Sequence, residues 1–172
     1  MTRYFHEKGL ATKVILYYHD DFDWLLTERA AGEDCTHPDY LADPKRLCEL
    51  LAERLRFLHA QDCAGCPVPH HTQLYLASVA EGYRIGRYDP HLFGAPAFAS
   101  PEDAWQQIQK SAHLLEENTL LHGDYCLPNV LLDHWRFSAF LDLDHAGVGD
   151  RHVDLFWGAW TLQFNLKTDR YR

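Results

Sequence analysis

The sequence lacks any long uncharged hydrophobic run, which excludes a membrane-spanning helix of the usual length. Residues 1–8 contain no apolar stretch of the signal-peptide type, so we expect a cytoplasmic protein. A regular cysteine framework is missing as well, because the five cysteines, at positions 35, 48, 63, 66 and 126, are odd in number and scattered. This pattern is typical of reduced thiols and not of disulfides.

The chain also lacks an excess of basic residues. The chain has 16 Lys and Arg against 25 Asp and Glu, which gives a net charge of −9. Nucleic acids favour a basic face, so we expect no nucleic-acid partner. An acidic cleft attracts polycations, although acidity also serves solubility alone, and the charge does not decide between the two. With 172 residues, 47% of them hydrophobic, the chain is one domain in size and long enough for a sizeable core.

Polar side chains follow short apolar runs in the stretch of residues 122–142. It opens with His122, Gly123 and Asp124, reaches Asn129 five residues after Asp124, and ends at Asp142 thirteen residues later. A charged residue directly after an apolar run is typical of a polar group held at the end of a buried strand. We therefore expect one turn and one hairpin to bring these carboxylate and carboxamide groups together.

Phosphoryl transfer needs this combination, since one carboxylate orients the attacking hydroxyl while an Asn and a second carboxylate hold Mg²⁺ on the triphosphate. The kinase pattern His-x-Asp-x-x-x-x-Asn fits residues 122–129, with Gly123 in place of Arg. Asp142 stands where the next metal-binding Asp is expected, followed by Leu143 and Asp144 instead of Phe-Gly. Asp and Asn are also common turn residues, but the His, the spacing and the second Asp together favour the catalytic interpretation.

With these motifs the sequence resembles the aminoglycoside phosphotransferase family, and most closely the aminoglycoside 3′-phosphotransferases, which are kinase-like enzymes. The resemblance spans nearly the whole chain and is weakest between residues 70 and 115. The matching stretches are His122-Gly-Asp124 with Asn129, Leu141-Asp-Leu-Asp144, Gly149-Asp-Arg-His-Val-Asp-Leu155, Trp24 to Asp34, Leu58-His59 and Asp150 to Tyr171.

The resemblance implies an α+β, protein-kinase-like fold, mostly the helical C-terminal lobe. Residues 1–31 would be a remnant of the N-terminal sheet with the hinge, and residues 32–172 the C-terminal lobe. It further implies transfer of the ATP γ-phosphate to a hydroxyl of a cationic aminoglycoside or similar small molecule, with ATP and Mg²⁺ as cofactors. Such a reaction is a mechanism of antibiotic resistance.

Roles for individual residues also follow from the resemblance. Asp124 would be the catalytic base, Asn129 and Asp142 would bind Mg²⁺, and His122 would brace the loop. The backbone carbonyl of Glu28 and the backbone amide of Ala30 would bind the adenine of ATP, although the same residues also fit an ordinary exit from a strand. Asp144 fits either a contact to metal or phosphate, or a cap of the following loop.

The chain departs from the family at both ends. The phosphate-covering loop and the ATP-anchoring Lys are absent before Val14, and Lys8 and Lys13 are the only early lysines. Further C-terminal helices that contribute acids to the antibiotic site are absent too. We therefore expect this chain to be a very poor catalyst, and the alternative is a truncated nucleotide-binding or scaffold paralogue. Two strands with an unpaired edge also suggest a dimer.

Local patterns predict the remaining elements. Strands are expected at residues 14–18 and 24–27, after a short helix and a turn at Gly9, and a loop at residues 86–99. Helices are expected from Pro44 to about residue 60, at 72–85, from Pro101 onward and from Asp150 to about residue 166. The predicted core stripe of the third helix is Trp105, Ile108, Ala112 and Leu115.

Six side chains near these helices have open roles. Asp154 is expected either to serve the helix dipole or to hydrogen-bond back to the catalytic loop, and His59 either to bind a ligand or to complement a helix end. A tetrahedral zinc site built from Cys63 and Cys66 with His70 and His71 is a weaker alternative, because the adjacent prolines stiffen the approach.

Overall fold

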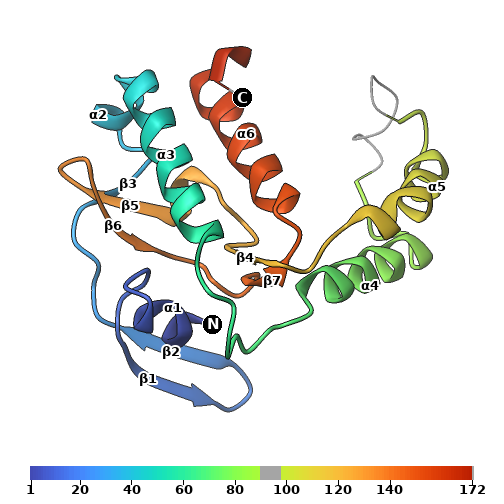
Figure 1. Cartoon of the computed structure of the whole chain (residues 1–172), viewed down its shortest axis with the longest axis horizontal. Coiled ribbons are helices and arrows are strands. Elements are labelled where there is room, and N and C mark those ends of the chain that lie inside the picture. Colours follow the sequence, from blue (N-terminus) through green and yellow to red (C-terminus); the bar gives the residue numbers. More distant parts are fainter. Residues whose placement is uncertain (90–97, 172) are drawn as a thin grey trace.

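The structure is a computed structural model that describes residues 1–89 and 98–171. Most of the loop predicted at residues 86–99 lies outside this described part. Helices and three small antiparallel sheets alternate along the chain (Figure 1). The α-helices are α1 (Thr2–Glu7), α2 (Pro38–Leu41), α3 (Pro44–His59), α4 (His71–Arg84), α5 (Pro101–Ser111) and α6 (His152–Leu166). Short 3₁₀ turns are η2 (Ala112–Leu114), η3 (Leu127–Asn129) and η4 (Asp169–Tyr171).

The strands pair only antiparallel with one another. They are β1 (Val14–His19), β2 (Asp23–Thr27), β3 (Glu33–Asp34), β4 (Thr119–Leu121), β5 (Val130–Asp133), β6 (Arg136–Phe140) and β7 (Gly147–Gly149). The sheets have the orders β1-β2, β3-β5-β6 and β4-β7. The β5–β6 hairpin is the one predicted from the apolar runs, and its register pairs Val130 with Phe140.

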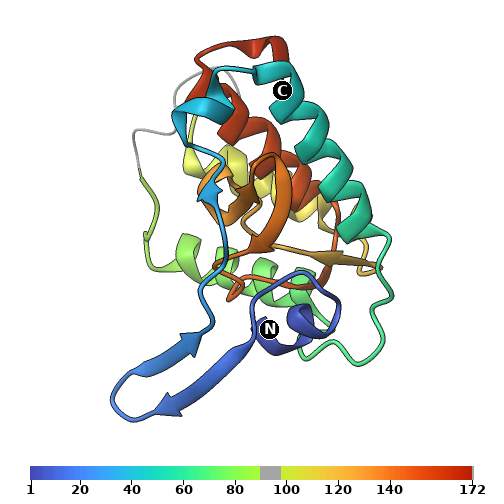
Figure 2. The same ribbon diagram turned by 90° about the vertical axis from the view of Figure 1, so that its left-hand side faces the viewer.

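The core lies between the β3-β5-β6 sheet and the helices α3 and α6, which run side by side in both views (Figures 1 and 2). The buried face of α3 presents leucines at helical spacing, as predicted: Leu47, Leu51, Leu55 and Leu58. The N-terminal segment contributes to the same core, since Phe5 packs edge-on against Phe140 and the Phe140 N–H donates to the Leu10 carbonyl over 2.8 Å.

Helix starts follow the predicted capping chemistry. The Asp43 carboxylate accepts the Arg46 N–H at the start of α3, and the Ser100 hydroxyl accepts the Asp103 N–H at the start of α5. The last predicted helix begins two residues after Asp150, at His152. Among the helices that the structure describes, none combines the length and the apolar character needed to cross a membrane.

The predicted core stripe of α5 is wrong. No residue of α5 is buried, and Leu115, beyond its end, is exposed. The reason is that α5 packs on α4 at the side of the molecule, where the Trp105 ring stacks on Tyr83 with centroids 5.1 Å apart (Figure 1). A helix covered by one neighbour buries its apolar face only in part. The helix itself was predicted correctly from the spacing of its apolar residues, but their burial in the core was not.

The β1–β2 hairpin stands apart from this core. It projects from the body of the molecule as a two-stranded ribbon, joined to β3 by residues 28–32 (Figure 2). Its side chains are exposed along both strands, with the partial exception of Val14 and Thr27 at the base. The ribbon therefore contributes little to the buried core of the described chain.

Candidate active site

The turn after β4 carries the first predicted residues. Strand β4 is fully buried, and its last residue, Leu121, pairs with Gly147 of β7. Gly123 then turns the chain with φ of +84°, and a Cβ atom on it would lie 1.9 Å from the His145 carbonyl oxygen. Only glycine fits this close approach of two backbone segments. The sequence Leu-His-Gly-Asp thus places Asp124 directly beyond a rigid turn.

His122 is completely buried beneath this turn. Its ring packs edge-on against Phe140 and Tyr125, with centroids 5.3 and 6.1 Å away. Burial lowers the pKa of His122, so the ring is neutral at physiological pH. The ring atom Nδ1 accepts the Asp124 N–H over 3.3 Å, which agrees with the bracing role predicted for His122.

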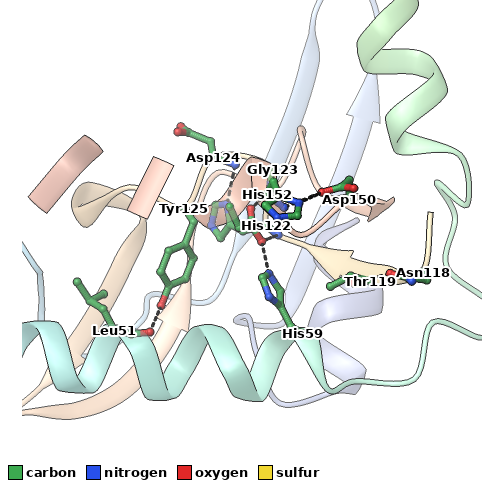
Figure 3. Close-up of polar contacts among 11 residues, drawn as sticks. Leu51, His59, Asn118, Thr119, His122, Gly123, Asp124, Tyr125, Asp150 and His152 are labelled. Carbon is green, nitrogen blue, oxygen red and sulfur yellow. Dashed lines mark hydrogen bonds and ion pairs between the residues drawn. The ribbon is translucent and has the colours of Figure 1, made fainter. Parts of the chain in front are cut away.

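Asp154 of α6 holds the same turn from the other side. Its carboxylate is inaccessible to solvent and accepts the backbone N–H groups of His122, over 2.9 Å, and Gly123, over 2.8 Å. The same carboxylate contacts His59 Nε2 over 3.0 Å. Figure 3 shows His59 rising from α3 toward this turn. Of the two roles expected for Asp154, the structure shows the hydrogen bonds to the loop that carries Asp124.

Asp124 and Asn129 are joined directly. The Asn129 carboxamide nitrogen donates to the Asp124 carboxylate over 2.9 Å and to the Asp124 carbonyl over 3.0 Å. Asp124 is only half-buried, and in Figure 3 its carboxylate points away from His122 and His59. Since both N–H groups of the carboxamide are engaged, Asn129 Oδ1 is left as the acceptor for a ligand.

Asp142 lies at the same end of the β5–β6 hairpin. The Leu141 N–H donates to the Asn129 carbonyl over 2.9 Å, so the chain passes Asn129 just before it reaches Asp142. Asp142 is exposed and has φ of +54°, the left-handed region that Asp and Asn tolerate better than most residues. A hydrogen bond that protonated Asp142 donates to the Asp144 carboxylate, together with burial and the charges of Asp144 and Asp124, raises the pKa of Asp142. A bound cation would relieve this repulsion between carboxylates.

Glu28 and Ala30 lie apart from these residues, where the chain leaves β2. The Glu28 N–H donates to the Lys13 carbonyl over 2.9 Å, which ends the ribbon. Within the described residues, the Glu28 carbonyl and the Ala30 amide have no backbone hydrogen-bond partner. Binding of a ligand by these two groups stays a prediction, and no hydrogen bond between described residues joins them to Asp124, Asn129 or Asp142.

Three of the four side chains of the zinc alternative contact different partners. Cys66 Sγ contacts the Val68 carbonyl over 3.5 Å, and His70 Nδ1 contacts Glu117 over 3.2 Å. His71 is buried and stacks on Tyr75. In residues 1–89 and 98–171, no three Cys, His, Asp or Glu side chains are grouped to hold a metal ion, so the geometry does not support the zinc site.

Sequence reasoning missed two supports of the loop. The Thr161 hydroxyl, buried on α6, accepts the Leu127 N–H over 3.1 Å. The Tyr125 hydroxyl donates to the Leu51 carbonyl over 2.8 Å (Figure 3). A threonine inside an apolar helix was the available signal for the first contact, because a buried hydroxyl needs a partner.

The fold is that of the kinase-like phosphotransferases. The structure aligns with the crystal structure of an aminoglycoside-3'-phosphotransferase of type VIII with a TM-score of 0.80 and 24% identity, over 96% of this chain and 64% of that one. It aligns with aminoglycoside phosphotransferase APH(3'')-Id from Streptomyces rimosus, in complex with ADP and streptomycin, with a TM-score of 0.77 and 18% identity, over 99% and 67% of the two chains. At these identities the likeness shows the fold alone.

The chain belongs to the aminoglycoside phosphotransferase family, as predicted from its motifs. The profile of the phosphotransferase enzyme family matches residues 1–170. A probable aminoglycoside 3'-phosphotransferase of Lactococcus lactis is 48% identical over 173 residues, which cover 100% of this chain and 66% of that protein. An aminoglycoside 3'-phosphotransferase of Niallia circulans is 31% identical over 154 residues, 90% of this chain and 59% of that protein. The chain thus spans less than two thirds of the length of these relatives.

Proposed function

We propose that the protein is an ATP-dependent O-phosphotransferase that transfers the γ-phosphate to a hydroxyl of an aminoglycoside or a similar cationic small molecule. The observation that carries this proposal is the joint placement of Asp124, Asn129 and Asp142 at one end of the β5–β6 hairpin. Phosphoryl transfer depends on positioned groups and on neutralised charge, with little covalent work by the protein.

In this proposal Asp124 orients the substrate hydroxyl and accepts its proton. The hydrogen bond from Asn129 holds one carboxylate oxygen, Oδ2, in place and leaves Oδ1 for the substrate. Asp124 is partly accessible, while the turn beneath it is buried, so the base is presented to the ligand on a rigid support.

The donor set fits Mg²⁺. Asn129 Oδ1 and the Asp142 carboxylate are hard oxygen ligands, and Mg²⁺ is commonly bound by one or two carboxylates together with substrate phosphates. When bound, Mg²⁺ would neutralise charge on the triphosphate. The raised pKa of Asp142 beside Asp144 and Asp124 supports the site, because clustered carboxylates gain from a cation.

ATP is the proposed phosphate donor. A solved relative contains ADP and streptomycin, and its fold is shared with this chain. The Glu28 carbonyl and the Ala30 amide, both without backbone partners in the described chain, would bind the adenine edge. In this scheme residues 1–31 correspond to a remnant of the N-terminal lobe with the hinge, and residues 32–172 to the C-terminal lobe, although Phe5 and Leu10 pack in the main core.

A cationic substrate is supported by the net charge of −9 and by the names of the relatives, which are aminoglycoside 3'-phosphotransferases. The alternative is a nucleotide-binding or scaffold protein without turnover. One observation favours it: the early lysine Lys8 donates to the Asp62 carbonyl over 2.7 Å and is not directed to a phosphate site. Lys13 directly precedes β1, at the base of the ribbon.

Two measurements on the same preparation test the proposal. Nucleotide titration with and without Mg²⁺ measures binding, and incubation with ATP, Mg²⁺ and a kanamycin-type aminoglycoside measures phosphorylated drug. Mg²⁺-dependent ATP binding with product formation supports the enzyme. Binding without product supports a non-catalytic nucleotide-binding protein. The absence of nucleotide binding contradicts both the enzyme and that alternative, and leaves only the scaffold.

A further inference from the structure

The β1–β2 ribbon exposes an unusual amount of apolar surface. Seven large side chains on its strands are each between 53% and 57% exposed: Ile15, Leu16, Tyr17, Tyr18, Trp24, Leu25 and Leu26. Phe22 at the tip is 70% exposed. Large exposed apolar side chains gathered on one element are typical of an interaction site, and an isolated two-stranded hairpin is only marginally stable in water.

Apart from a register irregularity between Val14 and Leu16, the free edge of β1 has little protection against pairing. Natural edge strands often carry charged residues, especially lysine, or proline, and these residues prevent association. Residues 14–18, Val-Ile-Leu-Tyr-Tyr, contain no charge, proline or glycine. Among the strands that the structure describes, β1 pairs only with β2. Its outer edge is therefore available to another strand.

The hydrogen-bond pattern identifies the residue at the centre of this edge. At the tip of the ribbon the Asp20 N–H donates to the Phe22 carbonyl, and the register pairs Tyr18 with Trp24. Hydrogen-bonded and non-bonded positions alternate along an antiparallel pair. The N–H and C=O groups of Tyr17 therefore point away from β2, into the free edge.

Charge at the two ends of β1 favours an antiparallel partner of the same sequence. Lys13 precedes the strand, and Asp20 and Asp21 follow it. Two β1 strands aligned antiparallel around Tyr17 place Lys13 of each copy near Asp21 of the other. A parallel alignment would instead place like charges side by side.

We propose that a second copy of this chain occupies the free edge, with two β1 strands paired antiparallel around Tyr17 into a four-stranded sheet. The same surface of each copy forms the contact, so the assembly closes as a two-fold dimer. The proposal goes beyond phosphotransfer and does not depend on it, since its readout is molecular mass.

Sedimentation or light scattering of the full 172-residue chain over a concentration series tests the proposal. Tyr17→Pro removes the outward N–H without removing a backbone hydrogen bond to β2, although the hydrogen bond from the Tyr17 hydroxyl to Asp23 is lost with it. We expect the dissociation constant of the dimer to rise about tenfold or more. The matched control is Leu25→Pro, since Leu25 is the cross-strand partner of Tyr17, is equally exposed and lies on the other edge. This control should leave the dimer intact.

A charge exchange tests the orientation. Lys13→Glu should weaken the dimer, and the double variant Lys13→Glu with Asp21→Lys should restore it. Circular dichroism confirms that each variant is folded. A monomer at all concentrations overturns the proposal, as does a dimer unchanged by Tyr17→Pro or weakened equally by Leu25→Pro. If the dimer is lost only with Phe156→Lys, the contact lies on the exposed face of α6, and this result also overturns the proposal.

Discussion

Asn129 donates both hydrogens of its carboxamide to Asp124, one to the carboxylate and one to the main-chain carbonyl, over 2.9 and 3.0 Å. This pair of hydrogen bonds therefore determines how two polar groups are presented. It fixes the Asp124 carboxylate, and it leaves Asn129 Oδ1 as the acceptor that we propose binds Mg²⁺. The five-residue spacing of the two residues is the distance along the chain that one short turn and η3 require.

Asp124→Ala should reduce phosphotransfer by about 10²–10⁴, because this is the usual contribution of a positioned general base. ATP affinity should change little, since Asp124 is not proposed to bind the nucleotide. The rate is measured for this chain or for a longer protein that contains it. Asp133→Ala, at the far end of β5, is the control. A loss below tenfold would show that Asp124 is only a turn residue.

Gly123→Ala should disrupt the turn that precedes Asp124. At φ of +84° a Cβ would lie 1.9 Å from the His145 carbonyl oxygen, so the backbone must move. Gly65 provides the control, because it has a similar φ of +71° and open space around it. We expect Gly65→Ala to cost about 1 kcal/mol and Gly123→Ala about 3 kcal/mol or more, by urea unfolding. Equal losses would mean that the close approach is easily relaxed.

Local patterns predicted the elements whose causes are local. The start of α3 followed from Asp43 and Pro44, and its buried face from the leucine spacing. The proximity of Asn129 and Asp142 followed from the apolar runs, because a hairpin joins its two ends in space. The helix α2 was not predicted, since four residues are too few for a periodic pattern.

Contacts distant in sequence could not be predicted in the same way. His59 and Asp154 are 95 residues apart, and only the packing of α3 beside α6 shows that they meet. Each had an adequate local explanation, the end of one helix and the start of another. The predicted burial of the apolar face of α5 was wrong for the same reason, because burial depends on which other elements pack against a helix.

Asp154→Ala should destabilise the fold strongly. Two buried backbone N–H groups, of His122 and Gly123, would lose their acceptor, and His59 would lose its partner. Each unsatisfied buried group costs about 1–3 kcal/mol, so we expect a loss of about 3 kcal/mol or more. Urea unfolding measures it, with exposed Asp39→Ala as the control. A loss similar to that of the control would show that the turn does not depend on Asp154.

Asp142→Asn should stabilise the metal-free protein at neutral pH. Asp144 and Asp124 raise the folded-state pKa of Asp142 above its unfolded value near 3.8, so the ionised carboxylate is unfavourable in the folded protein. Removing this charge gives a gain at pH 7. The gain should shrink as pH falls through the raised pKa and vanish below about 3.8, where Asp142 is protonated in both states. Urea midpoints of both proteins at low salt test this, and a gain that is independent of pH would contradict it.

The same substitution should remove Mg²⁺-dependent nucleotide binding while the fold persists. Asparagine tolerates the φ of +54° at this position, so the backbone need not change, but the anionic ligand is lost. ATP affinity is measured with and without Mg²⁺ for the unaltered chain, Asp142→Asn and the control Asp133→Asn, with circular dichroism of each. We expect Mg²⁺ to increase affinity in the unaltered chain and the control only. If Asp142→Asn binds Mg²⁺-ATP as tightly as the unaltered chain, Asp142 is not a ligand, and the carboxylate cluster has another role.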